Sequence, residues 1–413
     1  MVPKYWLDIS PLELLLAIGH LFRFTKLSND TKVKDFEEHF SNFIGTTHAK
    51  ACPNCRTGMY YSLVALGFEP GDEVILPAFT WWTDAGVVIE AGLNPVFVDV
   101  DFSTRNIDTH QIEKSITPKT KAILVTHLNG LPVDMDEIVR ISEKYNLRVI
   151  EDCARALGAS YKSKKVGSFD IGVFSFGFRK SIYGLDGGMV VARDHDFIIN
   201  LRKLMSPLPS PTWRNIGKRL ARTVMLKFFH YRYAYLLSIF PMLYAAYILN
   251  STPFKSMFSP SIPANHKVPK MPGLSMTNIQ AFLCNRQLKR TESNNAKRKE
   301  NARLLRIGLK HARPLDSSLS LPKVFDDRDD VSVHFAVWHP RKQELRDRCL
   351  RNLIEARDES AMDLTQLDLF QRWVHGKFPN AQRLHNKVMF LPNHPHLTKR
   401  QLKKTIKVIS EED

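Results

Sequence analysis

The chain has 413 residues, of which 44% are hydrophobic and 24% charged, with 59 Lys plus Arg against 42 Asp plus Glu. This composition is typical of a globular protein and excludes a disordered, collagen-like or coiled-coil chain, and the length favours two or three domains. Five cysteines are too few, and odd in number, for a disulfide framework, which favours a reducing compartment. The short apolar stretch 14–18 is followed by no cleavage site, so we expect no secretory signal.

The positive charge is unevenly distributed along the chain. Residues 201–290 contain 14 Lys or Arg and no Asp or Glu, so this segment carries most of the net charge of +17. Inside it lies an apolar, aromatic-rich run, 233–249, with Lys227, Arg232 and Lys255 around it. Basic flanks around an apolar run suit an anionic lipid surface better than a phosphate backbone. We therefore expect no nucleic-acid partner, but a cytoplasmic protein that lies peripherally on the inner face of a membrane.

Strand-like and helix-like patterns alternate through the first 200 residues. The strand-like runs are 74–76, 96–98, 122–125, 148–150 and 172–176, and the pattern predicts a helix over 134–146. Such alternation indicates βα units around a mostly parallel sheet, in which ligands collect at the carboxyl ends of the strands. Asp152 lies at such an end, and Lys180 follows the last run on a glycine-rich turn from which it can reach a ligand.

Three polar residues in this region have a characteristic spacing. Asp152 lies in Val-Ile-Glu-Asp-Cys-Ala-Arg-Ala-Leu-Gly, Ser175 follows it by 23 residues, and Lys180 follows Ser175 by 5. With Asp186-Gly-Gly behind Lys180, these segments resemble the DegT/DnrJ/EryC1/StrS family, and the resemblance extends from residue 36 to the C-terminus. It implies an α/β protein with the PLP-dependent transferase fold type I. Such a fold has a large domain with a mostly parallel sheet and a small α+β C-terminal domain.

The resemblance also assigns the residues around the ring of pyridoxal 5'-phosphate (PLP). Lys180 matches the amine that holds the cofactor covalently and acts as the base, and Asp152 matches the carboxylate beside the ring nitrogen. These two are the predicted catalytic residues. Trp81 falls where the family stacks an aromatic side chain on the ring. Arg155 stands where the family usually has Gln near the phenolic oxygen, where its charge would lower the pKa of that oxygen, unless it pairs with a substrate phosphate or carboxylate.

The phosphate end of the site departs from the family pattern. Arg56 and Thr57 fall on the positions that bind phosphate at a helix N-terminus, and Ser175 matches a serine whose hydroxyl reaches the phosphate. Many family members add an Asn from the partner subunit, but the equivalent run here is Gly273-Leu-Ser-Met. Arg56 or Arg179 is a candidate to replace that contact, because guanidinium binds phosphate oxygens in a fork.

The chain divides into three predicted parts: a large PLP-binding domain at 1–200, a basic apolar insertion at 201–265, and a C-terminal small domain with its entry helix at 266–413. Pro241 interrupts the apolar run of the insertion, so we expect an element at the membrane interface instead of a span, with a dimer interface or core packing as the alternative. A helix over 11–22 is expected to pack beside the insertion. Strand 331–337 and helix 398–409 are expected in the C-terminal domain.

Function follows from the resemblance. It implies a homodimeric PLP-dependent aminotransferase that moves an amino group from an amino acid, with glutamate as the expected donor, to a nucleotide-linked keto sugar in cell-surface polysaccharide or glycan biosynthesis. Two alternatives remain: a PLP enzyme acting on a lipid-linked or other membrane-borne carbonyl substrate, and a non-catalytic membrane-bound relative. No metal is expected, because Cys52-Pro-Asn-Cys55 has no second cysteine pair at zinc spacing.

Overall fold

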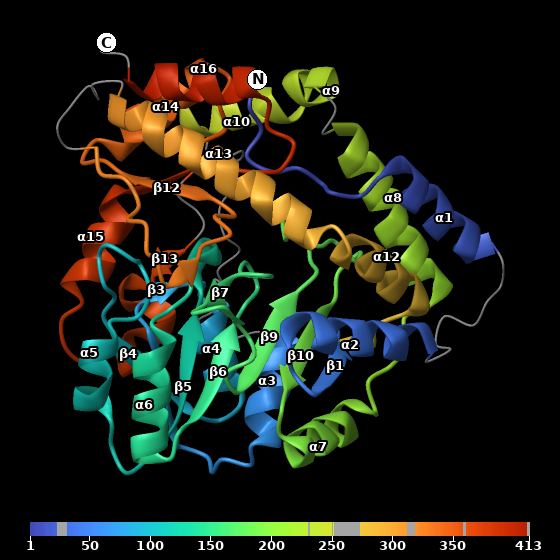
Figure 1. The fold of residues 1–413 in the computed structure, drawn as a ribbon, viewed down its shortest axis with the longest axis vertical. Helices are drawn as coiled ribbons and strands as arrows, with labels where there is room; N and C mark the ends of the chain where they lie inside the picture. The colour runs from blue at the N-terminus through green and yellow to red at the C-terminus, as the bar shows by residue number, and fades with distance from the viewer. Residues whose placement is uncertain are drawn as a thin grey trace.

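The computed structural model describes residues 1–22, 31–229, 232–249, 251, 273–311, 319–357 and 361–410. Its central layer is a seven-stranded sheet (Figure 1). The strands, in their order across the sheet, are β1 (His48–Cys52), β10 (Gly188–Ala192), β9 (Ile171–Ser175), β6 (Arg148–Asp152), β5 (Thr120–Thr126), β2 (Glu73–Pro77) and β4 (Asn94–Val98). Neighbours from β9 to β4 are parallel, and β10 is antiparallel to both of its neighbours. The five predicted strand-like runs are confirmed as β2, β4, β5, β6 and β9.

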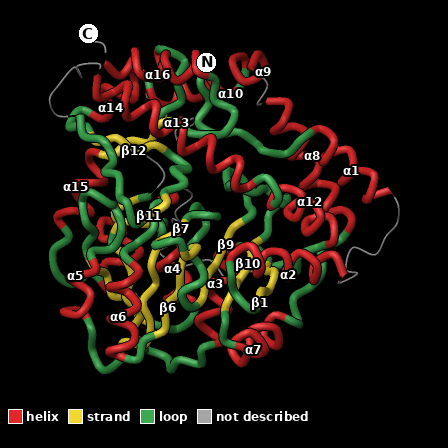
Figure 2. Tube along the Cα trace, in the orientation of Figure 1, coloured by secondary structure: helices red, strands yellow, loops and turns green. Residues whose placement is uncertain are grey.

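Helices cover both faces of this sheet (Figure 2). Alternate residues of a strand point to opposite faces, so Leu124 belongs to one apolar cluster while Ile123 belongs to another. The first face is covered by α3 (Cys55–Ala65), α4 (Thr83–Glu90) and α7 (His195–Met205). The second face is covered by α2 (Thr31–Ile44), α6 (Met135–Tyr145) and α12 (Asn278–Leu288). The predicted helix over 134–146 is confirmed as α6.

A second, smaller apolar cluster lies in the C-terminal part. It is built around the antiparallel pair β12 (Phe335–Trp338) and β14 (Val388–Leu391). Three helices pack on this pair: α13 (Thr291–His311), α14 (Lys342–Arg351) and α16 (Lys399–Ser410). The predicted C-terminal helix is confirmed as α16. The predicted strand 331–337 is correct only from Phe335, because Ser332 has a φ of 44° and donates its N–H to Asp330, which makes a turn there.

In the described part of the predicted insertion, three helices follow the end of α7. They are α8 (Trp213–Phe229), α9 (Arg232–Leu237) and α10 (Ile239–Tyr247). Tyr235, Phe240 and Leu243 are buried in one cluster with Leu350 of α14. The expectation that the apolar run 233–249 faces lipid is therefore wrong for these side chains, which pack in the core. Residues 252–272 lie outside the described residues, and within the described ranges no helix has both the length and the apolar character needed to cross a membrane.

The N-terminal helix α1 (Pro11–Phe22) packs against α8 and α12, as predicted (Figure 1). Ser10 caps it, because the N–H of Glu13 donates to the Ser10 hydroxyl over 3.1 Å and the N–H of Ser10 donates to the Glu13 carboxylate over 2.8 Å. Ala17 joins Ile216 and Leu220 of α8 in a buried cluster. The domain boundaries at 200 and 265 remain a prediction.

Candidate active site

A cavity of about 380 Å³ opens at the carboxyl ends of three neighbouring parallel strands. Thr126 ends β5, Asp152 ends β6 and Ser175 ends β9, and all three line the cavity. The structure brings together six of the seven predicted site residues in this wall: Arg56, Trp81, Asp152, Arg155, Ser175 and Lys180. Thr57 is not among the residues that line it.

The carboxylate of Asp152 is fixed from one side. Its Oδ1 atom accepts the N–H of Ala154 over 2.9 Å and the thiol of Cys55 over 3.7 Å. Burial, together with the neighbouring charge of Asp152, raises the pKa of the Cys55 thiol well above its ordinary value, so Cys55 is a donor and not a thiolate. Among the described residues, Oδ2 of Asp152 accepts no hydrogen bond. The arrangement leaves that oxygen to a ligand group that carries a proton.

The loop that carries Lys180 has an unusual backbone. Arg179, Leu185 and Asp186 have φ angles of 70°, 58° and 89°, in the left-handed region that residues with a side chain seldom adopt. Such conformations cost of order 1–3 kcal/mol each and persist only where the surroundings impose them. The loop around Lys180 is therefore held in its shape by its neighbours.

Helices α12 and α8 supply those restraints. The Gln287 side chain bonds both backbone groups of Tyr183: it accepts the N–H over 3.0 Å and donates to the carbonyl over 2.8 Å. Gln280 donates to the carbonyl of Asp186 over 3.0 Å. From α8, Arg219 donates to the carbonyl of Leu185 over 3.2 Å. Because these contacts come from two helices, they limit the positions that the lysine side chain can take.

The amine of Lys180 has an altered acidity. Burial, together with the positive charge of Arg155, lowers its pKa from 10.5 to about 8. The negative charge of Asp152 acts in the opposite direction and offsets only part of this effect. A lysine with this pKa is partly neutral near neutral pH, so it is able to act as a nucleophile and as a base.

The predicted phosphate end lies at the N-terminus of α3. Asn54 caps this helix, and its Oδ1 accepts the N–H of Thr57 over 3.1 Å and the hydroxyl of Thr57 over 3.3 Å. Thr57 is thus buried and already bonded, whereas Arg56 is exposed to the cavity. A Cβ at Gly188 would lie 2.8 Å from the backbone carbon of Asn54, so only glycine lets β10 approach this helix start.

Arg155 also lines the cavity, and its hydrogen-bond partner comes from the segment after β5. Its guanidinium donates to Oδ1 of Asn129 over 3.2 Å, and Asn129 has a φ of 56°. In the described part of the chain, the Nδ2 of Asn129 and the Nε of Arg179 are buried without a hydrogen-bond partner. Two unpaired donors among the residues that line one cavity suit a ligand with acceptor oxygens, since buried donors are normally satisfied.

Sequence reasoning missed Tyr5, which reaches the cavity from the N-terminal segment. Burial acts to raise the pKa of Tyr5, but the charges of Lys4 and Arg179 outweigh it and lower the pKa to about 7. The guanidinium of Arg179 lies 4.5 Å from the centre of the tyrosine ring. The sequence signal that could have pointed to Tyr5 is the aromatic pair Tyr5-Trp6 shortly before a capped helix. No local sequence pattern indicates that this pair lies near Lys180 in the fold.

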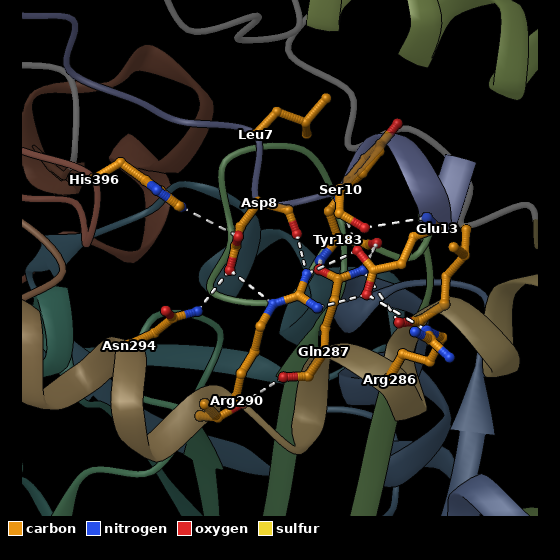
Figure 3. A network of polar contacts seen from close by, with 12 residues as sticks. Leu7, Asp8, Ser10, Glu13, Tyr183, Arg286, Gln287, Arg290, Asn294 and His396 are labelled. Atoms are coloured by element: carbon orange, nitrogen blue, oxygen red, sulfur yellow. Dashed lines mark hydrogen bonds and ion pairs between the residues drawn. The ribbon is translucent and has the colours of Figure 1, made fainter. Parts of the chain in front are cut away.

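A polar network anchors this N-terminal segment (Figure 3). Arg290, just after α12, forms ion pairs with Asp8 and Glu13. Asp8 also accepts from Asn294 over 2.6 Å and contacts His396 at 3.3 Å. The network fixes the residues that follow Tyr5 to the junction between α12, which also holds the Lys180 loop, and α13.

Asp84 and His127 are two further cavity residues that the sequence did not reveal. His127 contacts Glu151 at 3.0 Å and accepts the N–H of Val133 on its other nitrogen, so its Nε2 carries the proton. In the described part of the chain, His127, Glu151 and Cys153 form the group whose ligand atoms lie close enough together to hold a metal ion. The signal for Asp84 was an acidic residue in the otherwise apolar segment 84–89.

The donor set suits pyridoxal phosphate. A buried amine with a lowered pKa, a carboxylate with one available oxygen and a half-buried Trp81 line one cavity, together with Arg56 at a helix start. A mostly parallel seven-stranded sheet with these groups at its carboxyl edge defines a PLP-dependent transferase of fold type I. The predicted fold class is confirmed by solved aminotransferases of the same fold. One from Psychrobacter cryohalolentis is 25% identical, with a TM-score of 0.74 over 98% of this chain and 97% of its own.

The chain belongs to the DegT/DnrJ/EryC1/StrS aminotransferase family, whose pattern matches residues 14–217 and 264–410. It is similar to GDP-perosamine synthase from Caulobacter vibrioides, with 43% identity over 44% of this chain and 49% of that protein. It is also similar to the spore coat polysaccharide biosynthesis protein SpsC from Bacillus subtilis, with 38% identity over 43% of this chain and 46% of that protein. The chain thus spans about half the length of the curated relatives it matches. Residues 218–263, within the predicted insertion, lie outside both matched stretches.

Proposed function

We propose that the protein is a PLP-dependent aminotransferase that moves an amino group from glutamate to a nucleotide-linked keto sugar, as a homodimer, in the biosynthesis of a cell-surface polysaccharide. The observation that carries the proposal is the meeting of Lys180 and Asp152 in one cavity at the carboxyl edge of the sheet. The names of the two curated relatives support the sugar class and the polysaccharide.

Bound PLP supplies an electron sink for cleavage of the bond from the amino-bearing carbon to hydrogen. Lys180 would hold the cofactor, and its amine, once free, would take the proton from the amino-bearing carbon and return it. Its pKa of about 8 leaves a neutral fraction near neutral pH for this task. The available oxygen of Asp152 would accept a hydrogen bond from the protonated ring nitrogen and keep that proton in place.

The remaining predicted residues bind and orient. Arg56 and the Ser175 hydroxyl would bind the phosphate, while Thr57 would act indirectly, because its bonds to Asn54 fix the start of α3. Trp81 would cover one face of the ring. Arg155, oriented by Asn129, lies beside Lys180 and favours an anionic oxygen of the cofactor or a substrate carboxylate.

Transfer of isotopic nitrogen tests this proposal. The purified protein is incubated with PLP, ¹⁵N-glutamate and a panel of nucleotide-linked keto sugars, and labelled amino sugar is measured by mass spectrometry. We expect label in one amino sugar, loss of label in Lys180→Ala, and normal label in the matched control Lys203→Ala, which changes an exposed lysine of α7. Unchanged transfer by Lys180→Ala, or no transfer to any keto sugar, would contradict the proposal.

We also propose that the protein binds an anionic membrane surface through the exposed apolar side chains of α1 and α8, and not through Tyr235, Phe240 and Leu243, which are buried. Most of the large apolar side chains that are exposed lie on these two helices, with Leu15 65% exposed and Phe228 61% exposed. Both helices lie side by side at one edge of the molecule (Figure 1). We call the surface that carries these exposed apolar side chains the α1–α8 face.

The charge pattern of α8 favours lipid over a second copy of the chain. Trp213, Val224 and Phe228 fall on one side of the helix at about 100° per residue. Exposed cations repeat along the adjacent stripe at Arg214 and at every fourth residue after it, Lys218 and Arg222. A two-fold interface through this face would bring cations against cations, whereas anionic headgroups neutralise them.

Vesicle sedimentation tests the membrane proposal. We expect binding to phosphatidylglycerol-containing vesicles, weaker binding to pure phosphatidylcholine, and loss of binding in Phe228→Ser. The matched control is Val324→Ser, which removes an apolar side chain that is 66% exposed on another element. The proposal fails if the full-length protein stays in the supernatant with anionic vesicles at low salt. If Phe228→Ser also converts a dimer to a monomer, the α1–α8 face is a subunit interface.

A further inference from the structure

Asp84 occupies an unusual environment in the cavity wall. It lies in the first turn of α4 and is only 1% exposed. Among the described residues it forms no ion pair, and its side-chain hydrogen bonds go to two hydroxyl groups, those of Thr80 and Thr126. Burying an ionised carboxylate without a cation is costly, so the state in which Asp84 exists needs an explanation.

The contacts around Asp84 allow its hydrogens to be counted. The Thr80 hydroxyl lies 2.6 Å from Oδ2 of Asp84, the Thr126 hydroxyl lies 3.0 Å from the same oxygen, and the two hydroxyls lie 3.0 Å apart. Three oxygens thus form a closed triangle with three contacts of hydrogen-bond length. The two hydroxyls bring two hydrogens. The third contact is a hydrogen bond only if Oδ2 of Asp84 carries a hydrogen of its own.

Neighbouring charges point to the same protonation state. Burial, together with the charge of Asp152, raises the pKa of Asp84 well above its ordinary value. Two carboxyl groups in one dry site do not both ionise readily, so their proton affinities separate. The positive charge of Lys180 and the hydrogen bonds from the two threonines act in the opposite direction, but burial and Asp152 outweigh them. The other titratable groups that line the cavity are Tyr5, Cys55, Arg56, His127, Arg155, Arg179 and Asp186.

We propose that Asp84 is a positioning residue that keeps a proton on Oδ2 within the ring formed with Thr80 and Thr126, so that Asp152 is the single anion beside the cofactor's ring nitrogen. The functional part of this inference rests on the proposed aminotransferase activity. An ionised Asp84 would place a second negative charge beside Asp152 and disturb the single charge that holds the proton-bearing nitrogen. A neutral Asp84 leaves that charge undisturbed.

The protonation state is measured first, in PLP-free protein, where the outcome does not depend on the enzyme's activity. Infrared spectroscopy with ¹³C-labelled aspartate detects the band of a neutral carboxyl group at pH 7. We expect this band in the wild type, its loss in Asp84→Asn and its persistence, at a shifted frequency, in Thr126→Val. Absence of a neutral aspartate band, or a band that Asp84→Asn leaves unchanged, would overturn the proposal.

The pH dependence of unfolding gives a second readout. Asn places an N–H₂ where the protonated oxygen stood, so Asp84→Asn preserves the ring of hydrogen bonds. A carboxyl group with a raised pKa in the folded state keeps its proton there, whereas the unfolded chain releases it above about pH 4. The wild type therefore loses stability relative to Asp84→Asn as the pH rises above that value. The ratio of the two unfolding constants should change by up to about tenfold per pH unit. If the free energies of unfolding of the wild type and of Asp84→Asn differ by the same amount at every pH from 5 to 9, the proposal is overturned.

The coupling to Asp152 is tested in the holoenzyme. We expect Asp84→Asn to retain the visible absorption band of the cofactor with an unchanged pH midpoint, because it copies the neutral state. Asp84→Glu, whose longer side chain breaks the ring and brings a charge towards Asp152, should shift that midpoint. If the infrared result holds and the midpoint is the same in both variants, Asp84 is neutral but does not act on Asp152. Loss of the proposed transamination alone, with these spectra intact, would count against the function and not against Asp84.

Discussion

Replacing Lys180 by methionine should stabilise the PLP-free protein. Burial and the charge of Arg155 lower the pKa of Lys180 from 10.5 in the unfolded chain to about 8 in the folded protein. At about 1.4 kcal/mol per tenfold change, keeping Lys180 protonated costs up to about 3 kcal/mol of stability, less whatever water in the cavity screens. Methionine has a similar length and no charge, so at pH 7 the variant should be more stable by up to that amount.

The sign of the pH dependence distinguishes this cause from better packing. Below about pH 8 both states of the wild type are protonated and the full penalty applies. As pH rises from about 8 towards 10.5, the folded protein releases the proton before the unfolded chain does, so the wild type gains stability and the advantage of Lys180→Met shrinks. Urea unfolding from pH 6.5 to 9.5 measures this difference, with exposed Lys34→Met as the control. An advantage that is constant with pH, or absent, would refute the reasoning.

Two further substitutions test the ring nitrogen and the packing of the insertion. Asp152→Asn should still bind PLP, which its absorbance reports, but should slow single-turnover transamination by about 100-fold or more. The reason is that an amide does not hold the ring nitrogen protonated. Turnover at the wild-type rate would contradict the assignment. Leu243→Ala removes a fully buried side chain of α10 and should lower the free energy of unfolding by about 2–5 kcal/mol, as measured by urea titration, whereas a change below 1 kcal/mol would be incompatible with its burial near Leu350.

The sheet and its helices could be predicted because their signals are local. Residues 122–125 are apolar on both faces of β5, as a strand buried between two helical layers requires, and 134–146 has the helical periodicity of α6. The spacing of Asp152, Ser175 and Lys180 identified the cavity for the same reason, since these residues end or follow adjacent strands.

The remaining features depend on contacts between distant parts of the chain. An apolar run such as 233–249 has the same composition whether it faces lipid or protein, and only the fold places Leu350 against it. Tyr5 reaches the cavity because Arg290 anchors Asp8 and Glu13 far along the chain. The predicted role of Thr57 as a direct phosphate ligand likewise depended on what Asn54 binds, which the sequence does not reveal.

The proton on Asp84 was beyond prediction from sequence for the same reason. It depends on the hydroxyl of Thr126, which belongs to a different strand, and on the distance between two threonines. An acidic residue at the start of a helix ordinarily indicates a favourable interaction with the helix dipole. Only the closed triangle of contacts distinguishes a neutral carboxyl group from that common case.

The measurement that tests the central claim most directly is the location of the covalently held cofactor. Purified protein is loaded with PLP, treated with borohydride to fix the cofactor to the amine that binds it, digested and mapped by mass spectrometry. The structure predicts a single modified peptide that contains Lys180, since this lysine lines the cavity with Asp152 and has a pKa of about 8. Modification of a different lysine, or of none, while the protein remains folded would contradict the account.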